Sequence, residues 1–244
     1  MTPLSSASDG ILAERLALEA GRLLVAIRDT GLFDGKALGK AGDAVAHQFL
    51  AHALALHRPE DGFLSEEGAA DPARLEKARV WIVDPLDGTR EYGERRPDWA
   101  VHVALAIDGI AVVGAVAQPD LGVTYGNSAV SAACPGSIRI LVSRTRPPEA
   151  AQRAALALGA ELVPMGSAGA KAMAVVRGEA HAYVHAGGQF EWDSCAPVAV
   201  AASAGLHVSR LDGSPLIYNR QDPYLPDLVV CRPEVRDQLM AALV

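Results

Sequence analysis

The sequence has 244 residues, 50% of them hydrophobic and 21% charged, a composition typical of a soluble globular protein. Its formal charge of −7 disfavours nucleic acid as a partner, because a phosphate backbone is bound by a basic surface. Cys134, Cys195 and Cys231 are far apart and match no metal-ligand spacing, which predicts free thiols in a reducing, cytoplasmic compartment. We expect no signal peptide, and no apolar run reaches the roughly 20 residues of a membrane span.

Two helices are the first elements that the sequence predicts. A cap at Ser8 or Asp9 and an apolar stripe indicate a helix that ends before Gly31. Asp43 is placed to cap a second amphipathic helix. A short strand-like segment follows at 62–67 and brings two acids to its edge.

A strand predicted at 79–83 runs into an unusual turn. Pro85 has a fixed φ and no backbone donor, and it pushes Asp84 into an extended conformation, so we expect the strand to stop there. Gly88 permits a tight turn, and Thr89 can open a helix whose free amides attract an anion.

The second half of the sequence predicts further alternation of strands and helices. The pair Asp108-Gly109 favours a tight hairpin between strands at 101–107 and 110–117. A polar stretch at 126–136 indicates the boundary between two halves, 1–135 and 136–244. The later predictions are strands at 138–142 and 182–185 and helices at 148–158, 167–176 and 193–204. Such interleaving implies a layered α/β or α+β fold.

Five acidic residues lie near the ends of predicted elements, namely Asp43, Glu66, Asp84, Asp87 and Asp193. A single Asp before a helix is more often a cap than a ligand. Gathered together, these carboxylates would repel one another and destabilise the fold unless cations neutralise them. A donor set of oxygens, without Cys or His, indicates Mg²⁺, and two or three ions about 4 Å apart could hold a phosphoryl group and a water in line.

The remaining chemistry can be assigned to a few side chains and amides. Thr89 can orient the attacking water, with Asp43 or Glu66 as its carboxylate partner. The amides of Gly88 and Thr89 can cradle the phosphate at the start of the helix. No paired nucleophile and base are legible, so the reaction needs no covalent intermediate.

Three ordered segments resemble the signatures of the inositol monophosphatase superfamily: Glu66-Glu67, the run at 84–89, and the run at 192–197. Members are magnesium-dependent, lithium-sensitive phosphomonoesterases with an alternating α-β-α-β-α layered fold. The resemblance covers about residues 9–228. It implies that the metal ligands are Glu66, Asp84, the Leu86 carbonyl, Asp87 and Asp193. Asp43 falls where members place a carboxylate serving a further metal and the attacking water.

Several details are similar to the branch of this family that acts on bisphosphorylated nucleotides. These are the segment at 89–92, Ser143-Arg144, the segment at 191–193, and Lys171. Inositol enzymes typically carry a Glu where this chain has Ala186, which weakens an inositol preference. The similarity to the branch that acts on bisphosphorylated nucleotides also implies a role in sulfur metabolism.

The resemblance also implies a substrate site. Arg144 and Lys171 are candidates for a second phosphate, because a group away from the metals needs its own cations, although each could instead be a solvated surface residue. The full set facing the substrate would be Glu66, Leu86, Asp87, Gly88, Thr89, Arg144, Lys171 and Asp193.

The function that these observations predict is removal of the 3′-phosphate from 3′-phosphoadenosine 5′-phosphate, giving AMP and phosphate, with the 5′-phosphosulfate analogue as a further substrate. An inositol monophosphatase or a fructose 1,6-bisphosphatase of the same superfamily is the first alternative. The second is a metal-dependent phosphometabolite sensor without turnover. The partner is then a small phosphorylated nucleotide or sugar, and the sequence leaves a homodimer open.

Overall fold

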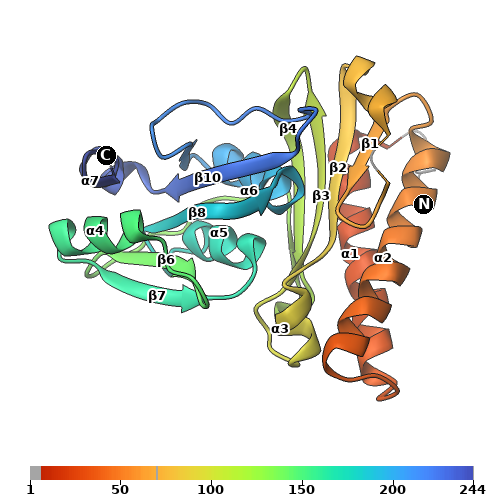
Figure 1. Cartoon of the computed structure of the whole chain (residues 1–244), viewed down its shortest axis with the longest axis horizontal. Helices are drawn as coiled ribbons and strands as arrows, with labels where there is room; N and C mark the ends of the chain where they lie inside the picture. Colours follow the sequence, from red (N-terminus) through yellow and green to blue (C-terminus); the bar gives the residue numbers. More distant parts are fainter. Residues whose placement is uncertain (1–6, 70, 244) are drawn as a thin grey trace.

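The computed structural model describes residues 7–69 and 71–243 and arranges them in five layers (Figure 1). Helices α1 and α2 cover one face of a first sheet, and α5 and α6 lie between that sheet and a second one. Helices α4 and α7 cover the outer face of the second sheet. This order confirms the predicted α-β-α-β-α fold.

The helices are α1 (Asp9–Asp29), α2 (Gly35–His57), α3 (Thr89–Gly93), α4 (Glu149–Leu158), α5 (Ala168–Val176), α6 (Glu191–Ser203) and α7 (Arg236–Leu243). The first sheet contains β1 (Gly62–Ser65), β2 (Arg79–Asp87), β3 (Ala100–Ile107), β4 (Ile110–Gln118) and β5 (Val123–Tyr125), in that spatial order. The second sheet has the order β7-β6-β8-β10-β9, with β6 (Arg139–Ser143), β7 (Glu161–Met165), β8 (Ala182–Phe190), β9 (His207–Ser209) and β10 (Tyr224–Cys231).

The hairpin between β3 and β4 forms where the sequence predicts it. Asp108 and Gly109 have φ values of 49° and 79°, and two positive values suit the tight turn that matches the twist of paired strands. Strand β1 is parallel to β2, whereas β2, β3, β4 and β5 pair antiparallel. In the second sheet β6 runs parallel to both β7 and β8, so the sheets are mixed.

One hydrophobic cluster joins the two halves of the chain. It contains Ile82 and Val116 from the first sheet, Tyr183 and Leu228 from the second, and Cys195 from α6. Helix α6 therefore buries side chains against both sheets. The two sheets correspond to the two predicted halves, and a boundary at residue 135 stays a prediction.

Two predicted boundaries were wrong. Asp43 does not cap the second helix, because α2 starts at Gly35 and places Asp43 in its interior. Strand β2 does not stop at Asp84 but continues to Asp87, and its register against β3 shifts between these two residues. The shift accommodates Pro85, which has no N–H for the ladder.

Other differences concern lengths and omissions. Helix α6 begins at Glu191, two residues before the predicted start, and β8 runs to Phe190, beyond the predicted end. The sequence analysis missed β5, β7, β9, β10 and α7. Strand β10 lacks a legible pattern because Pro226 and Asp227 interrupt its apolar run, at a register shift against β8. In the described part of the chain, no helix is long and apolar enough to cross a membrane.

Candidate metal centre and substrate site

Three carboxylates converge where β2 ends and α6 begins. Asp84 and Asp87 come from β2, and Asp193 lies in the first turn of α6. Each offers an oxygen within 4.8 Å of the others, and Asp84 and Asp87 are buried. The register shift in β2 and the layering of α6 against the first sheet bring together residues more than a hundred positions apart. The sequence predicted this convergence.

Asp87 is held by a dense set of donors at the start of α5. The amides of Ala168 and Gly169 donate to its carboxylate over 3.1 and 2.7 Å, and the Ser167 hydroxyl donates to it as well. His102 Nε2 lies 3.1 Å from the same carboxylate. Burial alone would raise the pKa of Asp87, but His102 and the hydrogen bonds outweigh it and lower the pKa to about 2. Asp87 is therefore charged at neutral pH.

His102 is a part of the site that the sequence analysis missed. Its ring is fully buried, and Nδ1 lies 3.1 Å from the Trp192 carbonyl, one residue before Asp193. Burial lowers the pKa of His102, yet the charge of Asp87 raises it above its ordinary value. Helix α5 approaches so closely that a Cβ on Gly169 would lie 2.1 Å from His102 Nε2. The sequence analysis placed Ser167 only at the start of a helix predicted over 167–176, and it found no functional signal at His102.

Asp43 and Thr89 meet although they are 46 residues apart in the chain. Thr89 Oγ1 lies 3.2 Å from Asp43 Oδ2 and 3.1 Å from the Leu86 carbonyl oxygen. The hydroxyl has one proton and faces two acceptors, so its lone pairs can accept a hydrogen bond from a further group. Asp43 Oδ1 is buried and has no hydrogen-bond partner among the described residues. Burial, and then the charge of Glu67, raise the pKa of Asp43 to about 7.

Glu66 stands at the rim of this centre rather than within the buried trio. Its side chain is exposed, but the surrounding protein and the charges of Asp43 and Asp87 raise its pKa to about 7. Burial and the neighbouring Glu66 and Asp87 raise the pKa of Asp84 well above its ordinary value. Burial and Asp87 also raise the pKa of Asp193 to about 7. Without a counter-charge the carboxylates repel one another.

The donor set fits hard divalent cations. It consists of carboxylate oxygens, one of them an orphan on Asp43, with the Leu86 carbonyl beside Thr89. Such oxygens suit Mg²⁺ better than softer metals. Cations at this place would also remove the repulsion that raises the pKa values of Asp84 and Asp193.

Gly88 makes the turn between β2 and α3. Its φ of 87° lies in the left-handed region, and an added Cβ would lie 3.3 Å from the Asp98 carbonyl oxygen and from Ser167 Cβ. Both the conformation and the space therefore favour glycine. Helix α3 therefore begins directly after the last residues of β2.

Protein groups already engage the two basic residues predicted to hold a second phosphate. Arg144 donates to Glu91 over 2.8 Å and to Glu94 over 3.0 Å. Lys171 Nζ is buried and donates to the carbonyl oxygens of Gly166 and Ser167 over 3.2 and 2.6 Å. Burial lowers the pKa of Lys171 to about 8. Their contact with substrate stays a prediction.

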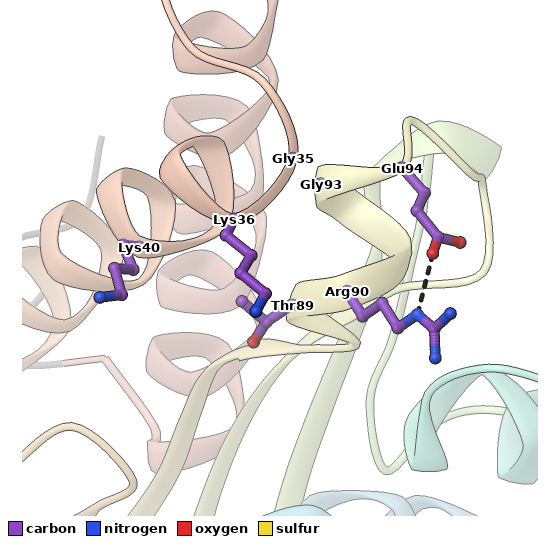
Figure 2. Close-up of a pocket in the computed structure, with 7 residues that line it drawn as sticks. All are labelled: Gly35, Lys36, Lys40, Thr89, Arg90, Gly93 and Glu94. Carbon is purple, nitrogen blue, oxygen red and sulfur yellow. Dashed lines mark hydrogen bonds and ion pairs between the residues drawn. The ribbon is translucent and has the colours of Figure 1, made fainter. Parts of the chain in front are cut away.

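A cavity of about 620 Å³ opens on the Thr89 side of the centre, between the start of α2 and α3 (Figure 2). Its lining residues are Gly35, Lys36, Lys40, Thr89, Arg90, Gly93 and Glu94. Arg90 donates to Glu94 over 2.8 Å, as the dashed line in Figure 2 marks.

The sequence profile of the inositol monophosphatase family matches residues 33–244. The chain belongs to this family. As a family member it is 49% identical to a 3′-phosphoadenosine 5′-phosphate phosphatase of Mycobacterium leprae, over 97% of this chain and 93% of the relative. A protein of the same name from Mycobacterium bovis is 50% identical, over 92% of this chain and 89% of the relative. The 3′(2′),5′-bisphosphate nucleotidase CysQ of Escherichia coli is 33% identical, over 76% and 81%.

Solved structures of family members share the fold. CysQ from Bacteroides thetaiotaomicron superposes with a TM-score of 0.80 at 25% identity, over 94% of this chain and 99% of that chain. The inositol monophosphatase from Anabaena has a TM-score of 0.73 at 23% identity, over 96% and 94%. At 23% identity, the likeness to the Anabaena enzyme shows a shared fold and carries no conclusion about the substrate.

Proposed function

We propose that this family member is a magnesium-dependent phosphomonoesterase that removes the 3′-phosphate of 3′-phosphoadenosine 5′-phosphate. The observation that carries the proposal is the identity of about half of all residues with the mycobacterial phosphatases of this nucleotide, over more than 90% of the chain. The convergence of Asp84, Asp87 and Asp193 supports it, because a phosphatase of this kind needs a metal centre.

In this proposal Asp84, Asp87, Asp193, Glu66 and the Leu86 carbonyl hold two or three Mg²⁺ ions. When bound, the ions would neutralise the negative charge of the carboxylates and of the phosphoryl oxygens. Among these ligands Asp87 is the best oriented, because the amides at the start of α5 and His102 hold its carboxylate in place and in its charged form.

Thr89 and Asp43 position the attacking water. The Thr89 hydroxyl donates its proton to Asp43, and its oxygen accepts a hydrogen bond from the water. This orients the water so that a lone pair of the water oxygen faces phosphorus. The new P–O bond forms from the water, and the bond between phosphorus and the 3′-oxygen breaks. A proton that the water loses ends on that oxygen, so the products are AMP and inorganic phosphate. The amides of Gly88 and Thr89 face the phosphoryl oxygens.

The second phosphate of the nucleotide is assigned to Arg144 and Lys171. Arg144 shares its guanidinium with two glutamates and is half-buried, so it keeps donors for an anion. Lys171 would have to turn Nζ away from the carbonyl oxygens that it now contacts. The same site would accept the 5′-phosphosulfate analogue, since the reacting ester is unchanged.

Steady-state kinetics with Mg²⁺ test the proposal. We expect a higher kcat/KM for 3′-phosphoadenosine 5′-phosphate than for inositol 1-phosphate or fructose 1,6-bisphosphate. A higher value for either sugar phosphate would overturn the nucleotide assignment and leave the phosphatase assignment intact. Binding of the nucleotide without any turnover would support the sensor instead.

A further inference from the structure

His102 lies among the three acids of the metal centre. In the ladder between β2 and β3 it is directly opposite Asp84, and the side chains of opposed residues project from the same face of a sheet. Its Nε2 lies 3.1 Å from the Asp87 carboxylate, and its Nδ1 lies 3.1 Å from the Trp192 carbonyl oxygen. Asp193 is the next residue. One imidazole ring therefore faces two of the acids and contacts the backbone beside the third.

The register shift in the first sheet gives His102 this position. Residues three apart on a regular strand face opposite sides of the sheet. Between Asp84 and Asp87, however, β2 advances by three residues while β3 advances by two. Both aspartates therefore project from the face of the sheet that His102 occupies, which is the face that α5 and α6 cover.

The two oxygens of Asp87 have different surroundings. Asp87 Oδ2 accepts hydrogen bonds from the Ser167 hydroxyl and the Gly169 amide. His102 faces this same oxygen. Among the described residues, Oδ1 accepts a hydrogen bond from the Ala168 amide alone, over 3.1 Å. Because a carboxylate oxygen has more than one lone pair, Oδ1 is the oxygen left free to bind a cation, and the contacts on Oδ2 fix the direction in which it points.

The contact with Trp192 joins the first sheet to the start of α6. Asp193 Oδ2 accepts the Phe190 amide over 2.7 Å, so this carboxylate is held within the first turn of its own helix. Its distance from Asp87 therefore depends on where that turn lies relative to β2. In the described part of the chain, the contact of His102 with the Trp192 carbonyl is the only hydrogen bond between the first sheet and this turn.

We propose that His102 is a positioning residue of the metal centre and sets the separation of the Asp87 and Asp193 carboxylates. The inference rests on the metal centre of the proposed function and is independent of the substrate. The ring is fully buried, and α5 passes close to it at Gly169, so the ring has little room to turn away from its two contacts. Removing either contact should leave the ligands in place but less well oriented for a cation.

Two substitutions separate the contacts of His102. The amide of His102→Gln can donate near Asp87, as Nε2 does, and the shorter amide of His102→Asn can donate near the Trp192 carbonyl, as Nδ1 does. Neither variant can span both partners. Calorimetric titration with Mg²⁺, without substrate, measures the Kd. We expect the Kd to rise roughly 10- to 100-fold in each variant, as is usual when the partner of a metal ligand is lost.

Val103→Ala is the matched control. Val103 is the next residue on β3, is also fully buried, and belongs to the cluster on the opposite face of the sheet, under α1 and α2. The cavity that the substitution leaves should lower the melting temperature in EDTA. The Kd of Mg²⁺ should stay within about twofold of the wild-type value, because no ligand contact is changed. A loss of stability alone is thereby distinguished from a loss of positioning.

Each other result counts against the inference. A wild-type Kd in either His102 variant would show that one contact suffices, and an equal rise in Val103→Ala would show a general effect of destabilisation. If the longer Gln prevents folding, His102→Asn decides alone, since its side chain is smaller than the ring. A wild type that binds no Mg²⁺ would overturn the proposed metal centre as well, whereas equal and measurable affinities in the wild type and the variants would overturn only the role of His102.

Discussion

At the scale of single residues, two aspartates of one strand end have opposite electrostatic environments. Asp87 accepts hydrogen bonds from two backbone amides and a hydroxyl and lies beside the imidazole of His102. These contacts lower its pKa to about 2. Asp84 accepts the Leu86 amide over 3.0 Å and otherwise faces acids, so its pKa is raised well above the ordinary value. The fold itself therefore stabilises the charge of Asp87, whereas Asp84 depends on a counter-ion.

This contrast predicts the behaviour of Asp84→Asn. The amide removes a ligand and a repelling charge together, so turnover should fall by more than roughly 100-fold. The melting temperature without Mg²⁺ should equal or exceed that of the wild type, because the buried repulsion is relieved. Steady-state kinetics and thermal melts with EDTA measure the two effects. Activity near the wild-type level would contradict the ligand role.

The acids of the centre could be predicted from the sequence because the segment at 84–89 combines a strand end, a forced turn and paired carboxylates. His102 could not, since a histidine inside an apolar strand has no local pattern that distinguishes a contact with Asp87 from ordinary packing. The sequence offered Asp43 or Glu66 as the carboxylate partner of Thr89; the structure shows the contact with Asp43, whose place inside α2 was missed. Its carboxylate contacts Thr89 instead of capping, which only the packing of α2 on α3 reveals.

At the scale of elements, the close approach of α6 to β4 fixes where Asp193 lies. Gly114 in β4 permits it, because a Cβ there would lie 2.4 Å from the Ala196 carbonyl oxygen and 2.8 Å from Ala199 Cβ. Both obstacles belong to the interior of α6, so a small shift of a flexible side chain cannot relieve them.

The sequence analysis missed strands β5, β7 and β9, because three to five residues at sheet edges give too few positions for an alternating pattern.

We therefore expect Gly114→Ala to lower the free energy of unfolding by roughly 1–3 kcal/mol, the usual cost of overpacking. Equilibrium urea denaturation without Mg²⁺ measures it. The matched control is Gly10→Ala at the start of α1, where an added Cβ meets nothing within 4 Å. The control should be neutral or slightly stabilising. Equal stabilities for both variants would show that α6 does not press on β4.

At the scale of the whole molecule, the metal centre draws its carboxylates from both halves of the chain. Asp84 and Asp87 belong to the first half and Asp193 to the second, while the cluster around Cys195 already joins the sheets. A bound ion should therefore stabilise the assembled fold as one unit. At a concentration about 100 times its Kd, it should raise the melting temperature by roughly 5–10 °C.

That stabilisation should depend on pH in a defined direction. Asp43, Glu66 and Asp193 have pKa values of about 7 in the metal-free fold, against about 4 in an unfolded chain. These groups hold extra protons in the folded state, so their contribution to stability is complete below about pH 4 and is lost as the pH rises to about 7. Protons and Mg²⁺ compete for the same oxygens. The rise in melting temperature caused by Mg²⁺ should then be larger at pH 8 than at pH 5.5.

Taking the difference with and without Mg²⁺ at each pH isolates this effect. Contributions that Mg²⁺ leaves unchanged cancel. An example is His185, whose pKa burial lowers to about 4 and whose own influence on stability has the opposite sign. Differential scanning fluorimetry of the wild type and of Asp84→Asn makes the comparison. The variant should show a smaller rise at both pH values. A rise in the wild type that is the same at pH 5.5 and pH 8 would mean that Mg²⁺ binds away from these carboxylates.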